Sequence, residues 1–195
     1  ARAARLRDAI RLGFVEGETI SQMVRRVRGP KALGYSDGIL EIDRRGAAAL
    51  VRTAVAHTAN VAREGVYGAN DALIKAVRGV STLDGRTTAL CRARDGQEYP
   101  PNKGPRPPAH WNCRSATVPV LADEFAALNR GGTRASQDGP VSGKTTYNDW
   151  LKTQPREFVE DVLDRTRAKL YLDGKLSLDR FVDRRGTELT LEQLR

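Results

Sequence analysis

Residues Ser81 to Pro119 read STLDGRTTALCRARDGQEYPPNKGPRPPAHWNCRSATVP, and the rest of the chain is organised around this stretch. It contains both cysteines, one of the two histidines and one of the two tryptophans of the chain, with five prolines between residues 100 and 108. Each proline fixes its own φ and disfavours helix at the residue before it. The segment between the cysteines is therefore predicted to be a stiff, extended loop.

Both ends of this loop carry residues that could pin it. Asp-Gly pairs at residues 84–85 and 95–96 predict tight turns, because glycine accepts positive φ and aspartate bonds nearby backbone amides. Cys91 precedes the loop and Cys113 follows it, with His110 three residues before the second cysteine. We expect these three side chains to close the loop.

Composition predicts a basic protein with a modest core. The chain has 195 residues and a net charge of +9, with 39% hydrophobic and 6% aromatic residues. The arginine-rich excess predicts an anionic partner, nucleic acid first and an acidic protein surface second. No apolar run reaches the roughly 18 residues of a membrane span, so no membrane partner is expected. Two cysteines do not make a secreted disulfide scaffold, which favours folding in a reducing cytoplasm.

A basic amphipathic helix is expected over residues 1–15. Leu6, Ile10 and Phe14 fall on one stripe of it, and arginines occupy much of the remainder. Its apolar stripe predicts that one face is buried.

A second short helix is expected through residue 28. Thr19 with Gln22 matches a capping box at its start. Its last turn holds Arg25, Arg26 and Arg28. This cluster either contacts the phosphates of a nucleic acid or forms a solvated helix face.

The clearest helical periodicity spans residues 41–77. Leu50, Ala54 and His57 recur on one apolar stripe, so His57 is expected to be a core or interface histidine. Arg52, on the adjacent face, is expected to be buried and paired with an aspartate of the central stretch, since a buried cation needs a partner.

Two strands are expected to flank the central loop and bring its ends together. Residues 75–83 and 114–121 have strand-like composition, and Pro119 places the second strand at a sheet edge. These elements predict an α+β fold that is mostly helical, with a small sheet around the Pro-rich Cys/His motif.

The C-terminal part is expected to begin after a break in composition. Residues 129–144 are dominated by Gly, Ser, Thr, Asp and Pro, which predicts a flexible linker. Residues 145–195 then read as a helical extension, opened by a Thr146–Asp149 capping box and carrying the packing residues Trp150 and Phe181.

The central stretch resembles the Mu F-type minor head proteins of tailed bacteriophages, which include the head morphogenesis proteins of the SPP1 type. Under this resemblance residues 1–128 form a Mu F-like head morphogenesis domain, with its central motif at residues 81–119. Residues 149–151, 174–182 and 188–191 are similar to the tail of Mu-type members. The motif residues are Asp84, Arg86, Cys91, Asp95, Gly96, His110, Asn112, Cys113 and Arg114.

The resemblance implies a structural role without enzymatic activity. A protein of this family would be a minor component of the virion head, assembled in the host cytoplasm near the portal. Expected partners are the portal protein and the major capsid protein or scaffold, with no small-molecule substrate. Nonspecific, salt-sensitive contacts to packaged double-stranded DNA agree with the basic composition.

This chain departs from the family pattern at two cysteine positions, which hold Thr88 and Ser115 here. That departure excludes a four-cysteine metal site and leaves three interpretations of Cys91, His110 and Cys113. The cysteines are buried and reduced, or they form a disulfide, or the three residues bind zinc with Asp84 or Asp95 as a fourth ligand. The expectation is no cofactor, with zinc as the exception.

Two other functions stay open from the sequence. The pair His110 and Asn112 beside cysteines is reminiscent of metal-dependent HNH nucleases, in which a histidine activates water near a divalent ion. Against this, no second histidine or carboxylate cluster lies at ligand spacing. The chain could also be the delivery module of a phage-borne toxin, because similar modules are fused to effector domains.

Overall fold

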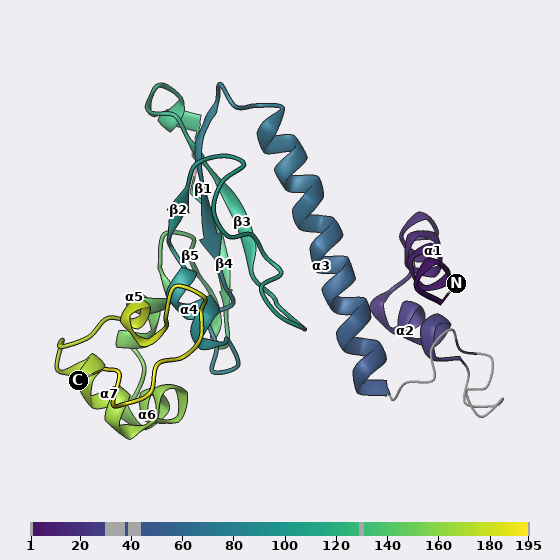
Figure 1. Cartoon of the computed structure of the whole chain (residues 1–195). Coiled ribbons are helices and arrows are strands. Elements are labelled where there is room, and N and C mark those ends of the chain that lie inside the picture. The colour runs from purple at the N-terminus through teal and green to yellow at the C-terminus, as the bar shows by residue number, and fades with distance from the viewer. Residues whose placement is uncertain (1, 30–37, 39–43, 129–130, 195) are drawn as a thin grey trace.

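The computed structural model describes residues 2–29, 38, 44–128 and 131–194. The described chain is mostly helical and has a small antiparallel sheet, which confirms the predicted α+β class. Figure 1 shows the long helix α3 between two N-terminal helices on one side and the sheet on the other, with the C-terminal helices gathered near one end of the sheet.

Helices α1 (Arg2–Val15) and α2 (Ile20–Arg28) form as the sequence predicts. The capping box is present, since the Thr19 side chain accepts from the Gln22 amide and the Gln22 side chain accepts from the Thr19 amide. A Cβ at Gly13 would lie 2.8 Å from the Met23 side chain, so glycine permits the close approach of α1 to α2.

Helix α3 (Arg44–Gly68) is shorter than predicted. Residues 41–43 of the predicted helix lie outside the described residues, and its last residues belong to a strand instead. One small core joins this helix to α2, made of Met23, Val27, Ala47 and Val51.

Two expectations about α3 need correction. His57 is exposed, so it is not a core histidine and only the interface alternative stays a prediction, and Arg52 is exposed instead of buried. The stripe of Leu50, Ala54 and His57 has the predicted period, but periodicity does not say whether another element covers that face.

The three-stranded sheet has the order β2-β1-β3, all antiparallel, with β1 (Ile74–Val80) in the centre. The edge strands are β2 (Glu98–Tyr99) and β3 (Ala116–Leu121). Pro119 lies in edge strand β3 opposite Val77, as predicted. The short 3-10 helix η2 (Asp123–Leu128) follows. Tyr67 of α3 packs with Ile74 and Val77, and its hydroxyl donates to the Thr117 carbonyl at 3.1 Å.

The expected flexible linker is wrong for residues 133–142, which form a hairpin. Strands β4 (Thr133–Ser136) and β5 (Gly139–Ser142) pair in register. Long-range bonds order this polar segment: the Leu83 amide donates to the Ala135 carbonyl at 3.2 Å, and the Gln137 amide donates to the Leu83 carbonyl at 2.9 Å. Local composition contains no sign of these partners.

The C-terminal part is helical, as predicted. It comprises α5 (Tyr147–Lys152), α6 (Arg156–Leu163), α7 (Arg165–Leu172) and the 3-10 helix η3 (Leu178–Phe181). The predicted capping box of Thr146 and Asp149 opens α5. Trp150 and Phe181 pack here as expected, in a cluster that also buries Leu83 of the central motif. The C-terminal helices and the central motif therefore share the largest core among the described residues.

Candidate metal centre

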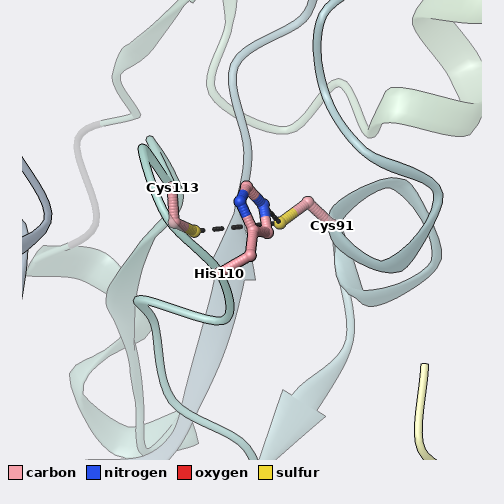
Figure 2. Close-up of side chains that lie close together, drawn as sticks. All are labelled: Cys91, His110 and Cys113. Carbon is pink, nitrogen blue, oxygen red and sulfur yellow. Dashed lines mark hydrogen bonds between the residues drawn. The ribbon is translucent and has the colours of Figure 1, made fainter. Parts of the chain in front are cut away.

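The short helix α4 (Ala89–Arg94) and the loop before β3 bring the two cysteines and His110 together. Thr88 caps this helix by accepting from the Cys91 amide at 3.4 Å. Cys91 Sγ lies 3.8 Å from Cys113 Sγ and 3.2 Å from His110 Nε2. Figure 2 shows the three side chains pointing toward one another. The sequence prediction that these residues close the loop is confirmed.

The imidazole of His110 has a defined orientation. Its Nδ1 lies 2.8 Å from the Trp111 carbonyl, and because a carbonyl only accepts, Nδ1 carries a proton. In the neutral ring Nε2 then carries the lone pair that accepts hydrogen bonds. That atom faces Cys91 and lies 3.0 Å from the Thr88 hydroxyl. A histidine that binds a metal is commonly oriented in this way by its second nitrogen.

Both thiols are free and buried, and they share a hydrogen bond. This contact lowers the pKa of Cys113 because a neighbouring thiol stabilises its thiolate. The same contact, together with burial, raises the pKa of Cys91. Thiolate is the form of cysteine that binds metal.

The cluster has the dimensions of a metal site. The ligand atoms of Cys91, His110 and Cys113 all lie within 4.8 Å of one another, and the group could hold a metal ion. A tetrahedral ion with metal–sulfur bonds of about 2.3 Å separates two sulfurs by about 3.8 Å. That separation matches the observed one, whereas a disulfide needs about 2.05 Å.

The aspartates named as possible fourth ligands are engaged elsewhere. Arg114 donates to Asp84 from both terminal nitrogens, at 2.6 and 2.8 Å. This pair lowers the pKa of Asp84 from 3.8 to about 2. The Arg86 amide donates to the same carboxylate at 3.1 Å, and the exposed guanidinium of Arg86 lies 3.6 Å from it. Asp84 therefore connects the two ends of the central motif.

Asp95 has the same kind of role on the other side of the motif. It is buried and accepts from the Ser81 and Tyr147 amides, each at 2.6 Å, and from the guanidinium of Arg134 at 2.5 and 3.0 Å. Gly96 follows with φ +79, as its turn requires. Asp95 thus connects the motif to the hairpin and to helix α5.

Two contacts attach the Pro-rich loop to α3. Arg106 Nε donates to Glu64 at 2.8 Å, and the Asn112 amide donates to the Thr53 hydroxyl at 2.9 Å. Asn112 has φ 59, a left-handed conformation that asparagine tolerates better than most residues. The turn therefore accounts for an asparagine at position 112.

Sequence reasoning missed several of these partners. The predicted partner of the aspartates was Arg52, whereas the structure uses Arg114 and Arg134. Thr88 was recognised only as a missing cysteine, but it borders the cluster and contacts His110. A helix-capping signal, a threonine followed by a short helical run, could have found it.

The predicted phosphate-binding arginines lie on α2, on the opposite side of α3 from α4 (Figure 1). Arg26 forms ion pairs with Glu16 and Glu18, so much of its charge is already neutralised. Arg25 is exposed and Arg28 is half-buried. The cluster is a partly paired helix face.

No helix in the described ranges combines the length and apolar character that crossing a bilayer requires. The comparisons with known proteins add no relative: no protein-family model, no curated protein and no solved structure matches this chain.

Proposed function

We propose that this chain is a structural component of a tailed-phage head, of the Mu F-like type, that assembles near the portal and is not an enzyme. The observation that carries the proposal is the convergence of the motif residues. Five motif residues spread over 31 residues of sequence come together in the fold. We call this group the clasp, and it consists of Asp84, Cys91, His110, Cys113 and Arg114. Asp84 pairs with Arg114, and the Sγ of Cys91 contacts His110 Nε2 and Cys113 Sγ.

The clasp suits a rigid building block better than a reaction centre. Asn112, the second residue of the nuclease-like pair, makes a turn and anchors the loop to α3. Within the described ranges no Asp or Glu joins the Cys91–His110–Cys113 group, and Asp84 and Asp95 are occupied by arginines. A divalent-ion nuclease needs carboxylate or additional histidine ligands for its ion.

The clasp is proposed to bind Zn²⁺ through Cys91, His110 and Cys113. Bound zinc would supply a redox-inert cross-link between α4 and the Pro-rich loop. Two sulfurs and an imidazole nitrogen are preferred zinc ligands, and the 3.8 Å separation of the sulfurs fits tetrahedral coordination. Thr88 provides the nearest hydroxyl, 3.0 Å from Nε2.

The role of the ion is testable by hydrogen exchange with and without a strong chelator. Chelation should speed exchange across residues 100–115, because the loop loses its cross-link, while α6 and α7 stay protected. His110→Ala should show the fast exchange without chelator, and Ser142→Ala, on the distant hairpin, should behave like the wild type. Unchanged loop exchange on chelation would contradict the zinc clip.

The head role is testable in particles assembled from phage genes that include this one. The chain should copurify with portal-containing heads, and a Cys91→Ala/Cys113→Ala variant should be lost from them. Absence of the wild-type chain from heads would refute the proposal. So would a nuclease activity of the purified chain that requires His110.

Contact with packaged DNA is proposed to be nonspecific and electrostatic. The net charge of +9 supports this, since phosphate contacts release counterions and weaken as salt rises. Retention of unrelated duplexes should fall steeply between about 50 and 200 mM salt, equally for every sequence. A flat salt response would contradict the phosphate-contact account.

A further inference from the structure

An apolar groove is lined by residues of α1, of α3 and of the Pro-rich loop. Its volume is about 850 Å³, and the tip of the Pro-rich loop closes one side with Trp111. The apolar lining includes the stripe that the sequence predicts for the first helix. The principal lining residues are Leu6, Ile10, Phe14, Leu50, Ala54 and Trp111.

Large side chains remain exposed around this groove. Trp111 is 68% exposed, Phe14 is 39% exposed and Val15 is 85% exposed. An isolated exposed apolar residue is ordinary, but a contiguous apolar hollow that includes an exposed tryptophan is typical of a binding surface. The other tryptophan, Trp150, is 4% exposed and belongs to the main core.

The charged residues that line the groove are both basic. Arg7 and Arg11, one helical turn apart on α1, line it together with the apolar side chains. Among the described residues, no carboxylate lines the groove or pairs with either arginine. Two like charges at this spacing repel each other mildly, and a carboxylate partner would relieve that repulsion.

We infer that this groove binds an acidic amphipathic helix of a partner protein. The apolar face of that helix would cover Leu6, Phe14 and Leu50, and its flanking carboxylates would pair with Arg7 and Arg11. A helix of roughly 14 residues spans about 21 Å and would match the length of α1. The inference does not depend on the proposed role in a phage head.

The groove chemistry favours this occupant over two others. Double-stranded DNA has no apolar surface of this kind for Phe14 and Leu50 to contact. A second copy of the chain would bring basic helices together, because α1 carries several arginines and the net charge is +9. Of these three occupants, only an acidic amphipathic helix complements both the apolar lining and the two arginines.

A designed peptide provides the probe. It has 14 residues, with leucine at helical i, i+3, i+4 and i+7 spacing and glutamate on the flanking positions. Titration into the whole chain should shift Trp111 emission to shorter wavelength as the indole leaves water, while buried Trp150 contributes a constant background. The same peptide with lysine for glutamate should bind at least about tenfold more weakly.

Matched variants separate the contribution of the two arginines from that of the apolar lining. Arg7→Glu/Arg11→Glu should weaken binding of the acidic peptide about tenfold or more and should reverse the preference toward the lysine peptide. Phe14→Ser should weaken both peptides. Arg5→Glu, an exposed change on α1 outside the groove, and Val66→Ser, at an exposed apolar position on α3, should change affinity less than about twofold.

Four results would overturn the inference. They are equal binding of acidic and lysine peptides, no emission change with either peptide, displacement of the peptide by a short DNA duplex with the same emission change, and self-association abolished by Arg7→Glu/Arg11→Glu. Analytical ultracentrifugation over a range of concentrations measures the self-association.

Discussion

The N-terminal helices and the remainder of the chain are stabilised in different ways. The core that joins α2 to α3 contains four buried side chains, whereas the core shared by the central motif and the C-terminal helices contains ten. Buried carboxylates at Asp84 and Asp95 fasten the second region, while the ion pairs of Arg26 lie near the surface of the first. The central motif and the C-terminal helices thus form a well-packed block, whereas the N-terminal helices are held by fewer buried side chains and by ion pairs near the surface.

The largest effect is expected at the buried pair of Asp95 and Arg134. Asp95→Asn leaves the guanidinium buried without its counter-charge, which should cost about 3–5 kcal/mol in the free energy of unfolding. Denaturant titration followed by circular dichroism measures this loss.

Asp123→Asn is the matched control for that variant. Its partner Lys75 is half exposed and the Asp123 side chain is 92% exposed, so the loss should be below about 1 kcal/mol. Equal losses for the two substitutions would contradict the distinction between a buried block and a solvated surface.

A smaller effect is expected from acid. The pKa of Asp84 is lowered from 3.8 to about 2 in the folded chain, chiefly by Arg114, so this carboxylate stabilises the fold fully above about pH 4. This contribution, about 2 kcal/mol, is lost as the pH falls from 4 toward 2. Unfolding free energies measured across that range should show the slope, and Asp84→Asn should remove it. If Asp84→Asn keeps the full slope of unfolding free energy against pH, the slope comes from other carboxylates.

The smallest effects compare the two capping boxes. Thr19→Ala and Thr146→Ala each remove one cap and should cost about 1 kcal/mol. Hydrogen exchange should accelerate in α2 for the first variant and throughout α5 and the central motif for the second. Faster exchange of α5 in Thr19→Ala would mean that the two regions unfold together.

Local patterns predicted the local structure. Both capping boxes, the helix stripes and the two strands that flank the loop follow from residues within a few positions of one another. The clustering of Cys91, His110 and Cys113 was also predictable, because a proline-stiffened loop has few ways to close.

Partner choice across the chain was not predictable. The hairpin at residues 133–142 has the composition of a linker and is ordered by Asp95 and Leu83, about 40 to 50 residues earlier. Asp84 pairs with Arg114 and not with Arg52, because tertiary packing decides which arginine arrives. The stripe that includes His57 has a helical period, but no periodicity reveals that it lines an open groove.

Native mass spectrometry of the purified chain, kept under reducing conditions with no added chelator, is the most direct test of the clasp. The account predicts one zinc ion per chain, lost in Cys91→Ala, His110→Ala and Cys113→Ala and retained in Arg25→Ala. A metal-free mass with two free thiols would contradict it.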